Sequence, residues 1–121
     1  MRVLEFAFVG YPITDVPRAR AFYEEVLGLT PASRFEHEGR IWLEYEVGPH
    51  TLAISNMQDD WKPSPDGAGV ALEVDDFAQA MEELKAAGVK IDGPHESPVC
   101  WMALVSDPDG NTIVIHKRKN G

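Results

Sequence analysis

The sequence predicts an α+β fold, in which two βαβββ modules form a curved, cupped mixed sheet with their helices on the outer face. The first observation behind this prediction is a hairpin in residues 106–116. There, Asp-Pro-Asp-Gly-Asn brings strong turn-forming residues together, and apolar, strand-favouring residues flank them on both sides. The sheet face that the helices leave uncovered is then the expected place for a ligand pocket.

The second observation is an internal repeat with an offset of 61 residues. Residues 51–54 correspond to residues 112–115, and both segments follow a turn that contains glycine. The same offset aligns Val9 with Val70 near the start of the two segments. Because both ends of the segments agree on one period, we expect a duplicated structural unit.

The first module is expected over about residues 3–57 of a single domain that spans residues 1–121. It begins with a mostly buried strand near residues 4–9. A helix follows, because Thr14 or Asp15 can cap its first turn and Gly28 can end it. Further strands are expected near residues 32–35, 40–47 and 51–55. Residues 40–47 alternate strictly, with Ile41, Leu43, Tyr45 and Val47 on one face and Trp42, Glu44 and Glu46 on the other.

A linker is expected over about residues 58–65, in a stretch rich in Pro, Gly and acidic residues. Trp61 within it is expected to cover the edge of a core or an interface more often than to bind a ligand. The second module, over about residues 66–118, repeats the order of the first. It has a strand at 70–74, a helix with an apolar stripe, a short strand near 89–91 and the final hairpin. Asp76 and Gln79 can supply a reciprocal capping pair at the start of this helix.

Composition and charge exclude several classes of function. The net charge of −9 repels the phosphate backbone of nucleic acids and disfavours an anionic membrane surface. The N-terminal apolar run is interrupted by Glu5 and is far shorter than a membrane span. Cys100 is the single cysteine, so no disulfide is expected, which fits a reducing compartment and a cytoplasmic location. No cofactor is expected from these features.

Three motifs resemble the vicinal oxygen chelate superfamily. They are Phe22-Tyr23 followed by Leu27-Gly28-Leu29 in the first helix, Val74-Asp75-Asp76, and Asp107-Pro108-Asp109-Gly110-Asn111. That superfamily includes glyoxalase I, extradiol dioxygenases, fosfomycin-resistance enzymes and the bleomycin-binding resistance proteins. The resemblance covers nearly the whole chain and implies the duplicated fold, whereas it says little about chemistry.

The resemblance also implies where a divalent metal would be held in the family's enzymes. One ligand would come from the first and one from the last strand of each module, at Phe8, Ala53, Gly69 and Val114. None of these side chains has a lone pair to offer a metal ion. The sequence therefore departs from the enzymatic pattern, and we expect no metal at this position.

Strand alternation carried from these four positions predicts which side chains line the concave face. The predicted ligand-binding residues are aromatic, acidic and apolar, with one histidine: Phe6, Phe8, Trp42, Glu44, Glu73, Trp101, Val114 and His116. Within this set, Glu44 and His116 are the best candidates for proton transfer. The alternative is that Glu44 looks into solvent and His116 makes a hydrogen bond near the terminus.

Three functions remain open at this point. The first is a non-catalytic binding protein that sequesters an aromatic or cationic small molecule, as bleomycin-resistance proteins do. The second is a lyase, isomerase or hydrolase related to glyoxalases and dioxygenases, with a metal-free or rearranged site using Glu44, Glu73 and His116. The third is a protein whose concave face is filled by its own side chains and which acts through partners. A homodimer is expected, because small relatives commonly complete their pockets across two chains.

Overall fold

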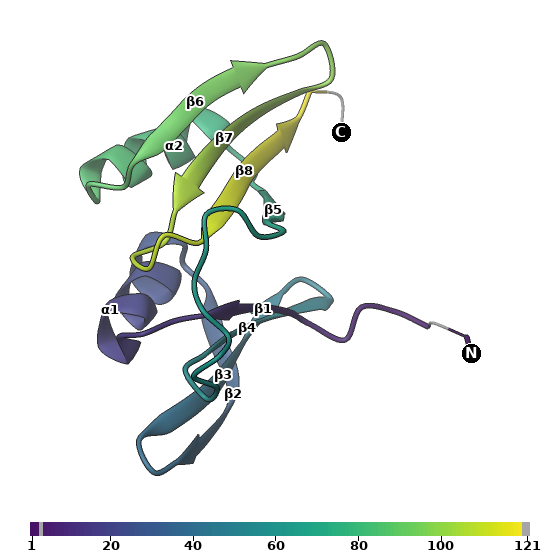
Figure 1. Ribbon diagram of the computed structural model, residues 1–121. Coiled ribbons are helices and arrows are strands. Elements are labelled where there is room, and N and C mark those ends of the chain that lie inside the picture. Colours follow the sequence, from purple (N-terminus) through teal and green to yellow (C-terminus); the bar gives the residue numbers. More distant parts are fainter. Residues whose placement is uncertain (3, 120–121) are drawn as a thin grey trace. The chain divides into compact units, whose positions relative to one another are not determined.

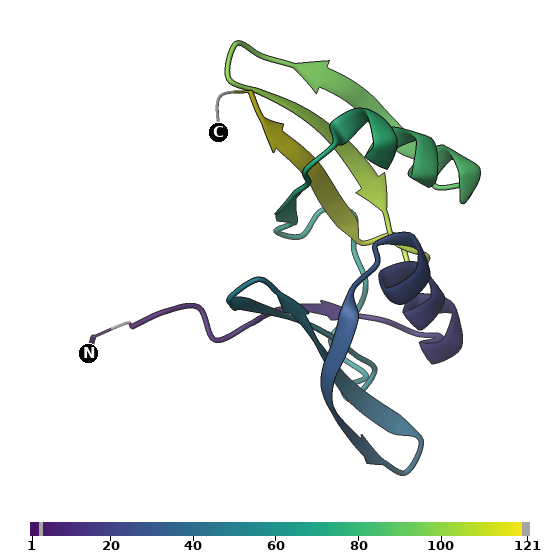
Figure 2. The same cartoon turned by 180° about the vertical axis from the view of Figure 1, so that it is seen from behind.

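A computed structural model describes residues 1–2 and 4–119 (Figure 1). These residues form two compact units, and the boundary between the units lies between Pro63 and Ser64. Each unit contains a four-stranded mixed sheet and a helical segment on one face of that sheet. Figure 2 shows from behind how the helix of the second unit lies against its sheet. The predicted α+β fold of two βαβββ modules is confirmed. In the described part of the chain, no helix is long and apolar enough to cross a membrane.

The first unit has the strand order β1-β4-β3-β2, with β1 parallel to β4 and the other pairs antiparallel. Its elements are β1 (Val9–Pro12), α1 (Val16–Arg20), η1 (Ala21–Val26), β2 (Thr30–His37), β3 (Arg40–Val47) and β4 (His50–Ser55).

The second unit has the corresponding order β5-β8-β7-β6. Its elements are β5 (Val70–Glu73), α2 (Phe77–Ala86), β6 (Ile91–Glu96), β7 (Cys100–Ser106) and β8 (Thr112–Arg118). The parallel pairs repeat the predicted offset, because Val9 pairs with Leu52 and Val70 pairs with Ile113. The two ends of the modules are therefore structurally equivalent.

The predicted caps are present at both helices. Asp15 accepts a hydrogen bond from the backbone N–H of Arg18 at 3.0 Å, and Asp76 accepts one from Gln79 at 3.0 Å. The first helix differs from the expected continuous α-helix, because its second half, η1, is π-helical. There the N–H of Leu27 donates to the carbonyl of Phe22, five residues earlier.

The mostly buried strand predicted near residues 4–9 is wrong, because β1 spans Val9–Pro12 and the described residues before it are exposed. Strand β1 begins at Val9, which pairs with Leu52, so each earlier residue needs a partner one step earlier in β4. Strand β4 begins at His50, directly after the turn that precedes it, and pairing cannot continue beyond this turn. The preceding residues are consequently exposed, and Leu4 and Phe6 are 78% and 91% accessible.

The hydrophobic core of the first unit lies between the helical segment and the sheet. Tyr23 and Tyr45 are fully buried and stack with their ring centroids 6.0 Å apart. The hydroxyl of Tyr45 donates to Glu24 at 2.9 Å, and Arg20 pairs with the same carboxylate at 2.6 Å. Burial and this bond to Glu24 raise the pKa of Tyr45, while the hydrogen bond from Arg20 lowers the pKa of Glu24.

The register of β7 contradicts one detail of the sequence analysis. Applying the 61-residue offset to β7 places Trp101 on the same face as His116. In the structure Trp101 pairs with Lys117. Ala103, two residues further along β7 and therefore on the same face as Trp101, is fully buried on the helix side. Trp101 therefore lies on the face opposite His116, and its predicted placement was wrong.

The hairpin turns explain this difference. Two residues connect β3 to β4, whereas the second turn has three residues between Asp107 and Asn111, whose backbones are hydrogen-bonded at 2.9 Å. Asp107 stabilises this turn by accepting the backbone N–H groups of Asp109 and Asn111. The extra residue shifts the offset of β7 by one position. A shift of one residue moves every side chain of a strand to its other face.

Candidate functional site

An aromatic cluster formed by Phe8, Trp42 and Trp61 lies on the helix-free face of the first sheet. Strand β3 buries Ile41 and Leu43 on the helix side, and alternation therefore turns Trp42 to the opposite face. Phe8 packs edge to face against Trp42, with ring centroids 5.0 Å apart and planes at 82°. Trp61 stacks on the same ring at 6.5 Å and 27°. The cluster offers broad apolar faces with defined geometry.

Trp61 reaches the cluster because the segment after β4 is tied to the sheet. The side-chain carbonyl of Asn56 accepts the backbone N–H of Ile41 at 2.7 Å, and its backbone carbonyl accepts a hydrogen bond from Arg40 at 2.8 Å. Arg40 also pairs with Asp59 at 2.7 Å, which lowers the pKa of that carboxyl. These contacts hold the segment that carries Trp61 against the sheet.

The sequence analysis assigned Trp61 to a core edge or an interface and did not place it in the pocket. Its position depends on Gly10 in β1, where an added Cβ would lie 2.9 Å from Cη2 of Trp61. A glycine inside a strand often marks a place where another group approaches the backbone closely. Gly10 was thus the signal in the sequence that pointed to a bulky neighbour.

A cavity of about 600 Å³ adjoins the aromatic cluster. Its walls are the three clustered rings together with Phe35, Ser55, Met57 and Gln58. This volume lies within the range of small-molecule pockets, which are mostly apolar with a few polar groups. Phe6 does not line this cavity, although the sequence analysis placed it with Phe8, and its side chain lies exposed before β1.

Glu44 provides a negative charge beside the cluster. It shares the face of Trp42, and one carboxylate oxygen accepts the indole N–H of Trp42 at 2.9 Å. The other oxygen accepts the hydroxyl of Ser33 from β2 at 3.2 Å. Two donors therefore fix the carboxylate next to the edge of an aromatic ring, which favours a ligand with a positive charge.

In the second unit, Glu73 and His116 form a close pair on the helix-free face. They are partners in the register of β5 and β8, and Nδ1 of His116 lies 2.5 Å from Oε1 of Glu73. The other oxygen of Glu73 accepts the backbone N–H of Arg118 at 2.7 Å. The hydrogen bond from Arg118, followed by that from His116, lowers the pKa of Glu73. Because Glu73 occupies Nδ1, Nε2 is the ring nitrogen that remains for a ligand.

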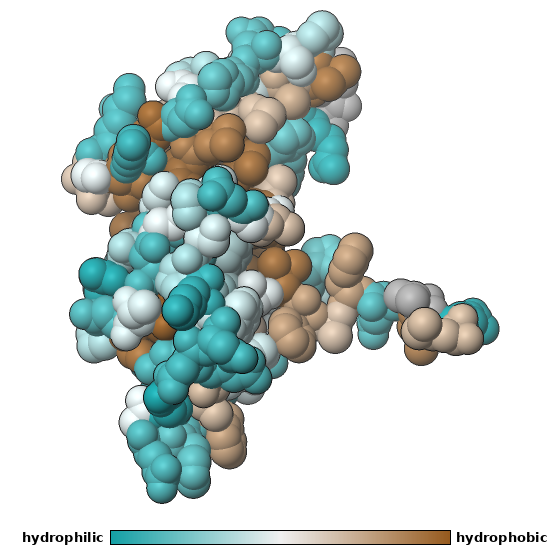
Figure 3. All heavy atoms as spheres, viewed as in Figure 1, coloured by the Kyte–Doolittle hydropathy of each residue, from teal (hydrophilic) through white to brown (hydrophobic). Residues whose placement is uncertain are grey.

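Apolar side chains continue this face beyond the pair. Val114 lies next to Leu104, and Met102 lies next to His116, in the register of β7 and β8. All four are half-buried, and Figure 3 shows apolar residues gathered over these two strands. Val114 thus shares the face of His116, whereas Trp101 does not.

The predicted pair of Glu44 and His116 stays a prediction. The two residues belong to different units, and each has its own contacts. Glu44 is held by Trp42 and Ser33, and His116 is held by Glu73. Among the predicted site residues, the acid–base contact is therefore the one between Glu73 and His116.

The residues at the predicted metal positions do not fit a metal ion. Phe8 contributes to the aromatic cluster, and Ala53 lies fully buried between Gly10 and Glu44 in the sheet. Val114 is an aliphatic residue of β8. Within residues 1–2 and 4–119, no three His, Cys, Asp or Glu side chains gather closely enough to hold a metal. We derive no chemical step through a metal.

The sequence profile of the Glyoxalase/Bleomycin resistance protein/Dioxygenase superfamily matches residues 5–115. The chain belongs to this superfamily. The match includes both structural units and all of the candidate residues apart from His116, which follows its last position directly. The resemblance seen in the sequence motifs is thereby confirmed.

Solved structures of this superfamily are similar to the chain over nearly its full length. TnmS3, an antibiotic binding protein from Streptomyces sp. CB03234, is 26% identical, with a TM-score of 0.82 over 98% of this chain and 99% of that chain. A putative glyoxalase family protein from Bacillus anthracis is 25% identical, with a TM-score of 0.82 over 98% and 100%. A glyoxalase/bleomycin resistance protein from the same Streptomyces strain is 27% identical, with a TM-score of 0.76 over 92% and 98%. A search of curated proteins gave no match.

Proposed function

We propose that this superfamily member binds and sequesters a flat, aromatic, positively charged small molecule at the aromatic cluster. The observation that carries the proposal is the arrangement of Phe8, Trp42 and Trp61 beside the carboxylate of Glu44. The cluster supplies apolar ring faces, and Glu44 supplies the charge that selects a cation. The proposed binding requires no metal and no cofactor.

The physical terms favour a planar ligand over a flexible one. A planar ring stacked on an aromatic side chain gains about 0.5–1.5 kcal/mol beyond its buried area. A cation near an aromatic ring adds about 0.5–2 kcal/mol, depending on how far it is removed from water. A rigid ligand also loses less conformational freedom on binding. The net charge of −9 adds a general attraction for cations.

The comparison with TnmS3 supports a binding role. That protein is described as an antibiotic binding protein, and it matches this chain over nearly the full length of both. We take from it the class of function, a protein that binds a small molecule. The chemical class of the ligand is argued from the side chains of this chain.

The test uses calorimetric titration with two three-ring compounds, the cation proflavine and the uncharged acridine at neutral pH. We expect saturable binding of both compounds, with proflavine the tighter. Trp42→Ala should weaken both by about tenfold or more, because a stacked ring contributes about 1–3 kcal/mol. Glu44→Gln should weaken the binding of proflavine and leave the binding of acridine unchanged. Treatment with a chelator should change neither titration.

Trp101→Ala is the matched control, because this tryptophan lies on the helix side of the second sheet. It should leave both titrations unchanged. An equal loss of ligand affinity in the Trp42→Ala and Trp101→Ala variants would contradict a site at the aromatic cluster. Equal affinity for proflavine in wild type and Glu44→Gln would remove the role of the carboxylate.

A second candidate function is metal-free proton transfer by a lyase, isomerase or hydrolase. The specific observation that favours it is the contact between Glu73 and His116, which fixes the imidazole and presents Nε2. Glu73 would act as a positioning residue. Activity of this kind should disappear in His116→Gln. In Glu73→Gln the activity should remain, with a shifted pH profile. Turnover that persisted in His116→Gln would exclude it.

We further propose that the protein is a homodimer in the cytoplasm. The single cysteine supports a reducing compartment. Large apolar side chains support an interface, because Leu4, Phe6 and Val99 are each at least 70% accessible.

A further inference from the structure

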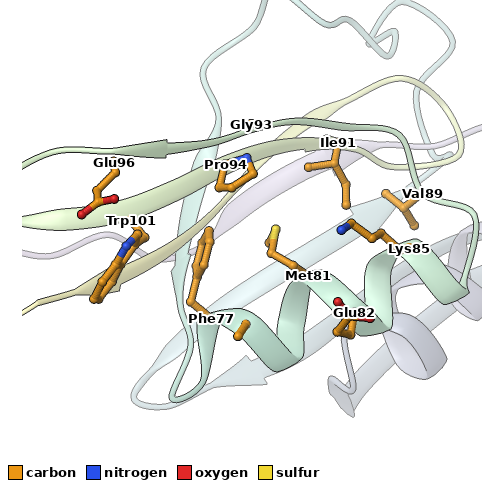
Figure 4. A pocket seen from close by; sticks show the side chains of 11 residues that line it. Phe77, Met81, Glu82, Lys85, Val89, Ile91, Gly93, Pro94, Glu96 and Trp101 are labelled. Carbon is orange, nitrogen blue, oxygen red and sulfur yellow. The ribbon is translucent and has the colours of Figure 1, made fainter.

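A second groove lies in the second unit, between α2 and β6, on the opposite side of the sheet from His116. Its volume is about 680 Å³, which is sufficient for a small ligand. Phe77, Met81 and Lys85 project from the helix toward Ile91 and Pro94 of β6, and Trp101 lies at one end (Figure 4). This groove shares no residue with the cavity at the aromatic cluster.

The core positions that correspond between the two units carry smaller side chains in the second unit. In the first unit, Tyr23 and Tyr45 fill the space between helix and sheet. The counterpart of Tyr23 is Leu84, 61 residues later. The counterpart of Tyr45 is Val105, 60 residues later, because the strand register shifts β7 by one residue. Both replacements are smaller and buried, and neither of them lines the groove. The walls of the groove come instead from α2, from residues 89–96 and from Trp101.

The groove has apolar walls and a cation at one end. Phe77, Met81, Ile91 and Pro94 form its middle, and Figure 4 shows the ammonium group of Lys85 directed toward β6. Phe77 and Lys85 are eight helical positions apart, which is about 12 Å along the axis, or the length of a chain of about ten carbons.

The acidic groups of the groove differ in their availability. Glu96, near Trp101, pairs with Lys119, and the ammonium group of Lys119 also stands 4.8 Å from the centre of the Trp101 ring. Glu82 lies at the same rim as Lys85, and both side chains are exposed. The end near Trp101 is therefore charge-balanced, and Lys85 remains as the group that can attract an anion.

We propose that this groove binds a small apolar carboxylic acid, with the carboxylate at Lys85 and the hydrocarbon body along Met81 toward Phe77. An ammonium group at the end of an apolar trough selects a molecule that is apolar along its length and anionic at one end. This site is independent of the proposed binding at the aromatic cluster, because its lining comes entirely from the second unit.

The test is methyl NMR of the full chain with ¹³C-labelled methionine, titrated with decanoate below its micellar concentration. Met81 lines the groove and Met57 lines the cavity at the aromatic cluster, so each site has its own reporter. We expect decanoate to shift the Met81 signal saturably at or below about 1 mM and to leave Met57 unchanged. Proflavine should shift the Met57 signal and leave the Met81 signal unchanged. Absence of a saturable Met81 shift overturns the proposal.

Two pairs of variants locate the ligand within the groove. Ala78→Trp fills the groove and should abolish the Met81 shift, whereas Ala86→Trp, on the same helix but outside the lining, should preserve it. Lys85→Gln should weaken decanoate binding about five- to tenfold, and Glu82→Gln should leave it equal or tighter. Binding retained in Ala78→Trp overturns the site.

Decanol tests the charge directly, because it has the same chain without the carboxylate. It should bind less tightly than decanoate to the wild type and equally to Lys85→Gln. Equal binding of decanol and decanoate to the wild type overturns the role of Lys85. Loss of proflavine binding with decanoate binding intact would instead contradict the proposed function of the aromatic cluster alone.

Discussion

At the scale of single residues, Gly10 has the sharpest structural requirement in the proposed site. An added Cβ would lie 2.9 Å from Trp61, closer than such contacts normally allow, so the indole must move. We expect Gly10→Ala to destabilise the protein by about 1–3 kcal/mol, as overpacking does, and to change the tryptophan fluorescence. Denaturant unfolding and emission spectra measure both effects.

Gly67→Ala is the control for this substitution. No atom lies within 4 Å of a Cβ added there, and its backbone is not in the left-handed region. It should leave both the emission spectrum and ligand binding unchanged. If Gly10→Ala were as stable as wild type with unchanged emission, Trp61 would not lie over Gly10 in solution.

The aromatic site was only partly predictable at this scale. Strand alternation placed Trp42 and Glu44 on the helix-free face, because a regular strand repeats every two residues. Trp61 was missed, because its position depends on Asn56, which accepts hydrogen bonds from Ile41 and Arg40 of β3, and such contacts have no local periodic signal. The pairing of Glu73 with His116 depends on parallel strands that are 43 positions apart.

At the scale of secondary-structure elements, Tyr45 links β3 to the helical segment. Its hydroxyl donates to Glu24, and this contact is charge-assisted because Arg20 keeps Glu24 ionised. We expect Tyr45→Phe to lower the free energy of unfolding by about 1.5–3 kcal/mol, the usual range for hydrogen bonds to charged groups. Urea unfolding at neutral pH measures this loss.

The same residue predicts a dependence on alkaline pH. The pKa of Tyr45 is raised in the folded protein, so its neutral form is favoured there. This stabilisation is fully present below the ordinary tyrosine pKa of about 10 and is lost as pH rises above it. The melting temperature of the wild type should fall more steeply above about pH 10 than that of Tyr45→Phe. Parallel profiles would contradict the assignment.

At this scale the caps and turns followed from the sequence, whereas the bounds of two strands did not: β1 is Val9–Pro12 instead of residues 4–9, and β6 is Ile91–Glu96 instead of residues 89–91. The caps Asp15 and Asp76 and the turn at Asp107 were predicted, because each uses local hydrogen bonds. The sheet face on which Trp101 lies was not predicted, because a single additional turn residue moves every side chain of β7 to the opposite face from the one that the repeat implies. The π-helical half of the first helix was also missed, because its residues have ordinary helical spacing.

At the scale of the whole molecule, the duplicated fold is compatible with several chemistries, and the side chains on its strands decide among them. Two sites of different character result from one repeated framework. The first unit presents aromatic rings and Glu44 on the helix-free face, whereas the second presents an apolar groove with Lys85 on the helix side. The two units carry different side chains at these sites, and the additional turn residue places Trp101 on the helix side of the second sheet.

The proposed homodimer is the prediction that concerns the whole molecule. Leu4 and Phe6 are 78% and 91% exposed, and both lie before β1. A stable interface buries about 800 Å² on each partner, and covering such side chains is favourable at about 25 cal/mol per Å². Sedimentation at micromolar concentration should therefore give about twice the 13.4 kDa of one chain.

Substitution of both side chains by serine should shift this equilibrium toward the monomer, because the apolar area that drives association is removed. Glu5→Gln, which lies between them, is the matched control and should remain dimeric. A wild-type protein that sediments at the mass of one chain would exclude the homodimer. If the serine variant stayed dimeric, the interface would have to be formed by other exposed apolar residues, such as Val99, which is 70% accessible.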